Sequence, residues 1–183
     1  GWDYDDLSET SAIYRIVGDG KYWDIDVSNE KGNFDYLMNN DIDHTHPEVR
    51  DEIFKWTDWF IKETDVDGFR YDALKHISED FIKDLSGHII DENGIENFYL
   101  FGEFWQYSKD TISAYLESTN YQIDLFDVPL HFHFEEASKS MGNYDMRKIF
   151  DNTIVKDFPE QALTFVDNHD SHCLLYTSPS PRD

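Results

Sequence analysis

Three acidic side chains stand directly after short apolar runs, where they could support acid–base chemistry. Asp72 closes the run DVDGFRYD, Glu103 closes FYLFGE, and Asp170 follows ALTFVDNH. Side chains alternate along a strand, so Arg70 and Asp72 share one face. A guanidinium beside a carboxylate holds it ionised and oriented, as a nucleophile requires. A purely structural Arg–Asp pair explains this segment equally well.

The other two acids have different surroundings. Glu103 is flanked by the aromatic residues Phe101, Phe104 and Trp105. A carboxyl group in an apolar setting has a raised pKa and can keep its proton, as a general acid must. Residues 167–170 are four polar groups after an apolar strand, and a turn must bring His169 and Asp170 to one side. An exposed strand-end Glu and a capped loop are the structural alternatives.

Helices and strands are expected to alternate from residue 44 onward. Helices are predicted from Thr45 with an apolar stripe at Val49, Ile53, Trp56 and Phe60, from Ser78 to Gly94, around residues 112–116, and around Met146, Ile149 and Phe150. Strands are predicted at 65–72, 98–103, 123–128 and 162–166. This alternation indicates a parallel sheet covered by helices. No Gly-rich phosphate loop follows a strand, and the acids lie at strand ends, which favours a closed α/β barrel over an open doubly wound sheet.

The net negative charge of the chain argues against some classes of binding partner. The 183 residues include 39 acidic and 15 basic side chains, for a net charge of -24. Such a field repels phosphate backbones and anionic lipids, so we expect neither nucleic acid nor a membrane as partner. It is compatible with neutral substrates and with cations.

Both ends of the chain differ from its middle. Residues 1–43 are irregular and rich in Asp, Asn, Gly and aromatics. The sequence starts without Met or a signal pattern, so the cellular address is expected upstream, with secretion favoured over a cytoplasmic location. Residues 172–183 read as the translation of a transposon-type sequencing adapter and are excluded from functional reasoning. A native Pro/Ser-rich linker is the alternative.

Three strings resemble the signature regions of a known enzyme family. They are DGFRYDALKH at 67–76, FGEFW at 101–105 and FVDNHD at 165–170. In this order they resemble the α-amylase family, glycoside hydrolase family 13, and segments 32–38, 126–131 and 144–148 look like its liquefying bacterial branch. The resemblance implies that Asp72 is the nucleophile, Glu103 the general acid/base and Asp170 the transition-state stabiliser. It also implies that Arg70 orients the nucleophile and that Lys75, His76 and His169 contact sugar hydroxyls.

The resemblance further implies a fold and an activity. The expected fold is a partial (β/α)8 TIM barrel, about strands 4 to 7, over residues 44–171, preceded by the end of an irregular calcium-binding B domain at 1–43. The expected activity is retaining endo-hydrolysis of α-1,4 bonds in starch or glycogen by a monomeric full-length parent, while the 183 residues alone are expected to be inactive. Trp105 and Tyr107 either stack on sugar rings or pack in the core.

Two rival functions stay open at this point. Within the same enzyme class, the rival is an oligo-α-glucosidase or a transglycosylase. From a different class, the rival is a non-catalytic relative that binds glucan or calcium.

Calcium is the cofactor that the resemblance implies. Asp35 and Asp41 match its ligands, joined by the backbone carbonyl at His76, and Asp24 and Asp43 match an additional Na⁺ or Ca²⁺ site. Thr45 stands where close relatives have another Asp. Spacing alone gives little support, because these acids do not form an EF-hand loop. The His pairs 44/46 and 131/133 are interpreted as surface or core residues and not as zinc ligands.

Overall fold

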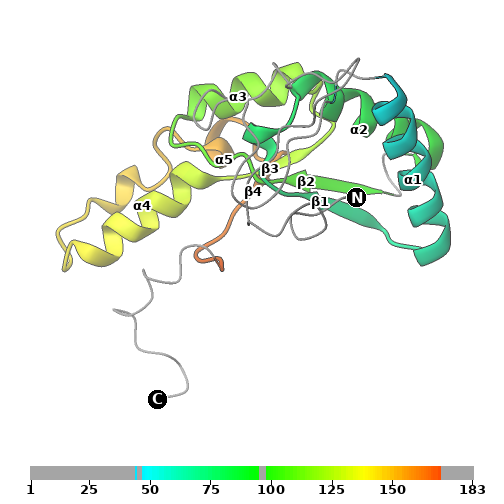
Figure 1. Ribbon diagram of the computed structural model, residues 1–183. Coiled ribbons are helices and arrows are strands. Elements are labelled where there is room, and N and C mark those ends of the chain that lie inside the picture. The colour runs from blue at the N-terminus through cyan, green and yellow to red at the C-terminus, as the bar shows by residue number, and fades with distance from the viewer. Residues whose placement is uncertain (1–43, 45–46, 95–97, 170–183) are drawn as a thin grey trace, which may run out of the picture. The chain divides into compact units, whose positions relative to one another are not determined.

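The computed structural model describes residue 44 and residues 47–94 and 98–169 (Figure 1). The chain divides into two compact units. The first comprises residues 1–68 and 74–98, and the second comprises residues 69–73 and 99–183. In the described part of the chain, no helix is long and apolar enough to cross a membrane.

The first unit contains two α-helices, α1 (Pro47–Thr64) and α2 (Glu79–Asn93), and the short 3-10 helix η1 (Leu74–His76). The predicted caps of α2 are confirmed. The Ser78 side chain accepts a hydrogen bond from the Phe81 backbone N at 3.3 Å, and Gly94 ends the helix with φ 82°, a conformation that glycine adopts without steric cost. The predicted cap of α1, Thr45, lies outside the described residues.

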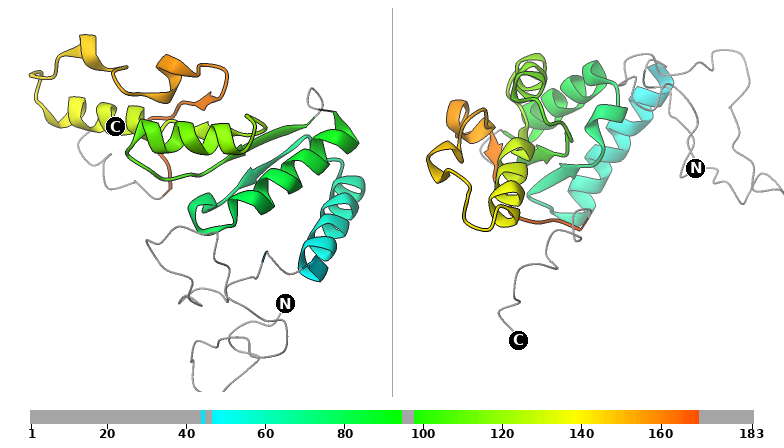
Figure 2. Two further views of the ribbon diagram at one scale, coloured as in Figure 1. Left: turned by 90° about the horizontal axis from the view of Figure 1, so that it is seen from above. Right: turned by 90° about the vertical axis from the view of Figure 1, so that its left-hand side faces the viewer.

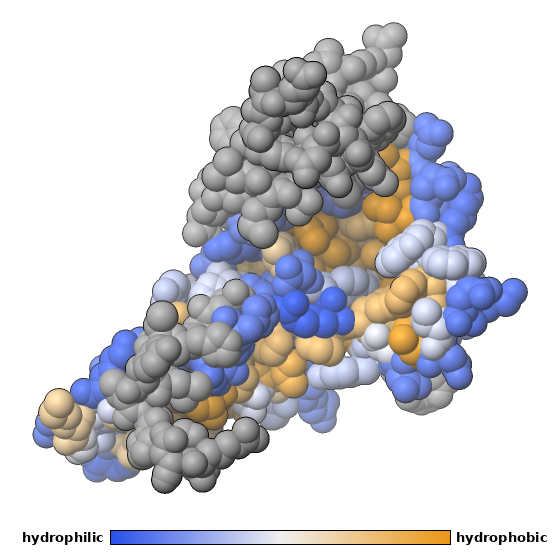
Figure 3. Space-filling model, turned by 60° about the horizontal axis from the view of Figure 1, so that its bottom comes forward, coloured by the Kyte–Doolittle hydropathy of each residue, from blue (hydrophilic) through white to orange (hydrophobic). Residues whose placement is uncertain are grey.

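Helix α1 contacts α2 through residues outside the predicted apolar stripe. The Phe54 ring stacks on His88 with centroids 5.0 Å apart, and Asp58 contacts the same imidazole at 2.7 Å. Only Thr57 of α1 is buried, whereas Trp56, a member of the predicted apolar stripe, is 53% exposed. Figure 3 shows apolar residues open to solvent on one face of the described chain. The helical period was predicted correctly, but the stripe is not the face that meets α2.

The second unit is built on a sheet with strand order β1–β2–β3–β4 (Figure 1). The strands are β1 (Gly68–Tyr71), β2 (Tyr99–Gly102), β3 (Asp124–Phe126) and β4 (Ala162–Leu163). Strand β2 pairs with β3 in parallel, and β3 pairs with β4 in parallel. The predicted parallel α/β sheet is therefore confirmed, with strands shorter than predicted. Each strand follows its predecessor in both sequence and space, so polar residues after the parallel strands meet at one edge.

The helices of this unit differ from the prediction in two respects. They are α3 (Lys109–Ser118), α4 (Val128–Lys139) and α5 (Ile154–Asp157), with a 3-10 turn η2 (Met146–Lys148). The predicted helix around Met146 is wrong, because only this turn forms there. Helix α4 was missed, since VPLHFHF reads as a continuing apolar strand. A Pro in the first turn is compatible with a helix, because the N–H groups there have no partner within the helix.

Asp127 explains why α4 begins where it does. This residue is fully buried, and its Oδ1 accepts from the Leu130 N at 3.1 Å. Its Oδ2 accepts from the Val155 N at 2.8 Å, and its own N donates to the Leu163 carbonyl at 2.9 Å. One carboxylate therefore caps both α4 and α5, which Figure 2 shows side by side, and the same residue ties them to β4.

Candidate active site

Arg70 joins two of the predicted catalytic acids. Its Nη1 lies 2.7 Å from Asp72 Oδ1, and its Nη2 lies 2.7 Å from Glu103 Oε2. The two carboxylates follow neighbouring strands, β1 and β2, and the Glu103 N donates to the Tyr71 carbonyl at 2.9 Å. The strand pairing and the planar guanidinium fork therefore hold both acids at one edge of the sheet.

The two carboxylates have different solvent access. The Asp72 side chain is 71% exposed, whereas that of Glu103 is 16% exposed. Two acids in unlike environments are suited to unlike roles, one as an accessible nucleophile and one as a shielded proton donor.

A strained turn follows Asp72. Ala73 has φ 50°, a left-handed conformation that costs a non-glycine residue about 1–2 kcal/mol. This residue ends the extended segment of Arg70 and Asp72, and η1 follows directly. Backbone strain of this kind is enriched at functional sites. The sequence carries no signal for it, because Ala is not a residue that favours such a turn.

Aromatic rings surround Trp105. Its centroid lies 5.8 Å from His131, 6.1 Å from Phe132 and 6.0 Å from Phe165. Trp105 is thus packed by helix α4 and by the segment after β4, while remaining partly exposed. Tyr107 is 68% exposed and stacks on Phe132 at 4.3 Å. Core packing accounts for the contacts of Trp105, and Tyr107 presents the more open ring.

The remaining predicted residues are distributed over the chain. Lys75 and His76 lie in η1 of the first unit. His169 is exposed in a turn after β4. The third acid, Asp170, lies outside the described residues, as do four of the five predicted metal ligands, Asp24, Asp35, Asp41 and Asp43. Among the residues that the structure describes, no group of three or more His, Cys, Asp or Glu side chains could hold a metal ion.

Phe126 and His131 were not predicted from the sequence to contact residues of the candidate site. Phe126, which ends β3, lies under the Arg70 guanidinium, with Cζ 5.9 Å from the ring centroid. His131, interpreted only as a surface or core residue, is 1% exposed and contacts Trp105. Strand order was needed to find the first, and helix α4 was needed to find the second.

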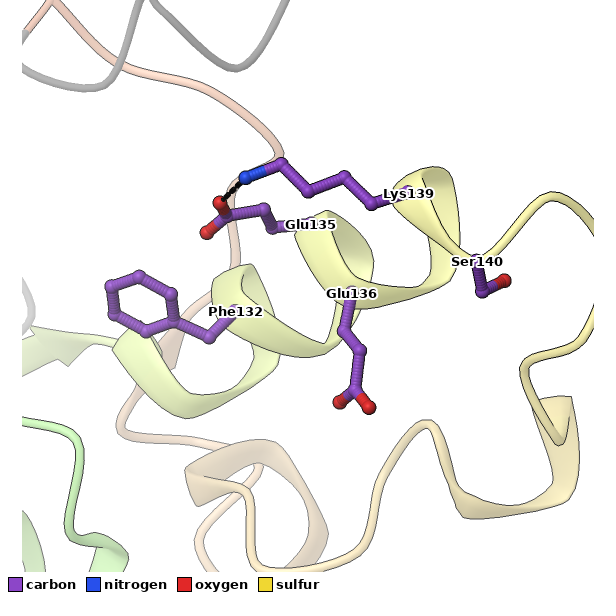
Figure 4. Close-up of a pocket in the computed structure, with 5 residues that line it drawn as sticks. All are labelled: Phe132, Glu135, Glu136, Lys139 and Ser140. Atoms are coloured by element: carbon purple, nitrogen blue, oxygen red, sulfur yellow. Dashed lines mark hydrogen bonds and ion pairs between the residues drawn. The ribbon is translucent and has the colours of Figure 1, made fainter.

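A shallow cavity of about 540 Å³ lies along α4 (Figure 4). Phe132, Glu135, Glu136, Lys139 and Ser140 line it, and Figure 4 shows Lys139 paired with Glu135. None of the predicted catalytic acids in the described part lines this cavity. The carboxylate pair, and not the cavity, is therefore the candidate active site.

Comparison with known proteins shows the family of the chain. The sequence model of the α-amylase catalytic domain matches residues 11–177. The chain belongs to the α-amylase family. It is 46% identical over 171 residues to an α-amylase of Bacillus licheniformis, covering 93% of this chain and 33% of that protein. It is also 46% identical over 172 residues to a glucan 1,4-α-maltohexaosidase of Bacillus sp. strain 707, with the same coverage of each.

A solved structure supports the same assignment. The crystal structure of an Anoxybacillus α-amylase matches with a TM-score of 0.58 and 27% identity, covering 73% of this chain and 29% of that chain. The chain thus spans about a third of the length of the α-amylase family members it matches.

Proposed function

We propose that this chain is the central part of the catalytic domain of a retaining α-amylase. In full length, the enzyme hydrolyses internal α-1,4 bonds of starch and glycogen. The observation that carries the proposal is the single guanidinium of Arg70 between Asp72 and Glu103. In retaining glycosidases the two carboxyl groups lie about 5–5.5 Å apart. Two carboxylates that share one guanidinium fork are kept close enough for this arrangement.

The different solvent exposure of Asp72 and Glu103 suggests their roles in the reaction. Glu103, the shielded acid, donates a proton to the glycosidic oxygen while Asp72, the exposed acid, attacks the anomeric carbon. This forms a glycosyl-enzyme and releases the first product. Glu103 then takes a proton from water, which attacks the same carbon and frees Asp72, so the anomeric configuration is retained. Asp170 stabilises the charge on the sugar ring, and Arg70 keeps Asp72 oriented.

Other parts of the assignment rest on the family resemblance. Lys75, His76, Trp105 and His169 contact the glucan, which is the only partner of a monomeric enzyme. Asp35, Asp41 and the His76 carbonyl would hold calcium, and Asp24 and Asp43 would hold a second ion. The described sheet forms strands 4 to 7 of a (β/α)8 barrel, with residues 1–43 at the end of a B domain.

Starch hydrolysis by the full-length protein and its E103Q and D72N variants tests this function. Each substitution removes a required group while preserving size, and general acid–base groups contribute roughly 10²–10⁴-fold to rate. We therefore expect both variants to lose at least about a hundredfold in kcat. The control is E117Q, which alters an exposed carboxylate on α3, and it is expected to match the wild type.

The products discriminate between the related activities. A mixture of short oligosaccharides supports endo-hydrolysis. Glucose alone, released from oligosaccharide ends, would show an α-glucosidase instead. Full activity in D72N would refute the assignment of the nucleophile.

A further inference from the structure

His131 is a buried histidine for which the proposed reaction has no use. It lies in the first turn of α4, four residues after the capping Asp127, and is 1% exposed. Its ring is stacked on Phe165, with centroids 4.6 Å apart and an interplanar angle of 12°. Phe165 belongs to the segment that leads from β4 towards His169.

The ring also makes one directed hydrogen bond. Its Nδ1 lies 2.9 Å from the carbonyl oxygen of Val166. A carbonyl oxygen can only accept, so Nδ1 must carry the hydrogen, and in neutral imidazole Nε2 is then left with its lone pair. Within the described part of the chain, Nε2 is buried and has no hydrogen-bond partner. A buried polar atom without a hydrogen-bond partner lowers stability, so the second nitrogen of this ring does not itself stabilise the fold.

The hydrogen bond from His131 holds Val166, which lies in the segment that leads to the third predicted acid. Strand β4 ends at Leu163, whose carbonyl accepts from Asp127 N. Val166 lies three residues beyond the strand, and its side chain is 66% exposed. Asp167, Asn168 and His169 follow it directly, and Asp170 is next in sequence. The His131 bond therefore fixes the chain beyond the end of the sheet ladder, at the second residue of the third signature motif.

We propose that His131 is a positioning residue for the active site. Through its Nδ1–H it holds the Val166 carbonyl, and through its ring it holds Phe165, so that the following residues enter the site at a fixed angle. This role rests on the proposed function. His131 touches neither substrate nor reacting atoms, and its effect on catalysis passes through the segment that it orients.

Three substitutions separate positioning from packing. H131F keeps a flat ring on Phe165 but removes the donor to Val166. H131N places an amide N–H near the position of Nδ1, and H131Q places one near Nε2. Misplacing reacting groups by about 1 Å costs roughly 10²-fold in rate. In the full-length protein we expect H131F and H131Q to lose roughly tenfold to a hundredfold in kcat with little change in KM, whereas H131N restores most of the loss.

The stability of these variants is a separate readout. H131F loses a hydrogen bond but also removes the buried unpaired Nε2, so its melting temperature is expected to stay close to that of the wild type. His133 provides the matched control, because it lies on the same helix and its Nδ1 contacts the Ile149 carbonyl at 2.7 Å. H133F removes an equivalent bond to a segment outside the signature motifs, and it should leave kcat unchanged.

The outcomes are distinct from those of the proposed function. Wild-type kcat in H131F, or equal kcat in H131N and H131Q, would overturn the positioning role while E103Q still reports on the function. If the wild-type protein hydrolyses no glucan, the proposed function fails, and the role in catalysis fails with it. Nitrogen-15 NMR of the imidazole then still tests the bond itself: hydrogen on Nδ1 is expected, and hydrogen on Nε2 would overturn it.

Discussion

Arg70 contacts the carboxylates of Asp72 and Glu103 through different nitrogens of its guanidinium group and lies over the Phe126 ring. Its side chain is 33% exposed. A guanidinium offers donors in a rigid planar fork, whereas the ammonium group of lysine is a compact point charge on a flexible chain. The relative position of the two carboxylates therefore depends on an arginine at this position and not on its positive charge alone.

R70K tests that dependence. Lysine keeps the positive charge but cannot hold both carboxylates in one plane, so kcat/KM on starch is expected to fall roughly a hundredfold. R147K is the matched control, because Arg147 also pairs with a carboxylate, that of Asp145, but is 89% exposed. It should retain wild-type kcat/KM. Equal activity in R70K and the wild type would show that charge alone suffices at this position.

Tyr99 gives a prediction about pH. Burial, with a further contribution from the hydrogen bond to Asp124, raises the pKa of Tyr99 from 10.0 to about 12. The folded state thus retains a proton that the unfolded chain releases, so this contribution to stability is complete below pH 10 and is lost as the pH rises towards 12. Absorbance titration of tyrosinate near pH 12 should show a smaller late-titrating amplitude in Y99F than in the wild type. Equal late amplitudes in the two proteins would contradict this.

The elements that were predicted correctly are those with local signals. Ser78 and Gly94 mark the ends of α2 because their chemistry acts on the nearest turn, and no distant contact is needed. Helix α4 had no such signal. Its start depends on Asp127, whose second oxygen serves α5, and a contact 28 residues away is not visible in a local pattern.

The capping role of Asp127 gives a prediction about stability. D127A removes the acceptor of the buried Leu130 N–H and of the half-buried Val155 N–H, and an unsatisfied buried group costs about 1–3 kcal/mol. We expect the free energy of unfolding of the full-length protein, measured in urea, to fall by at least about 2 kcal/mol. D145A removes the capping carboxylate of η2 at the surface and should cost far less. Equal losses would mean that Asp127 is an ordinary cap.

The candidate site was predictable only in part, because some of its contacts join residues that are distant in the sequence. Asp72 and Glu103 could be found because each is a polar residue directly after an apolar strand. Their shared contact with Arg70 depends on β1 lying beside β2. This adjacency belongs to the tertiary structure and cannot be seen in the local sequence. Two of the ring contacts of Trp105 come from α4, so they could not be predicted without that helix.

At the scale of the whole molecule, the described sheet has two edges, β1 and β4, and its strands are adjacent in chain order. This is the order of consecutive strands in a barrel. Two tryptophan side chains of α1 are open to solvent, with Trp56 53% exposed and Trp59 55% exposed. Together with coverage of about a third of its relatives, these features support the proposal that more of the barrel completes the enzyme.

The stereochemistry of hydrolysis tests the central claim, that Asp72 is a nucleophile and Glu103 an acid/base in one retaining site. Proton NMR can follow a maltooligosaccharide in the presence of the full-length protein and record the anomer that forms first, before mutarotation. The account predicts the α-anomer, because two displacements at one carbon restore its configuration. Initial formation of the β-anomer would contradict it, because a single displacement by water leaves no role for Asp72 as a nucleophile.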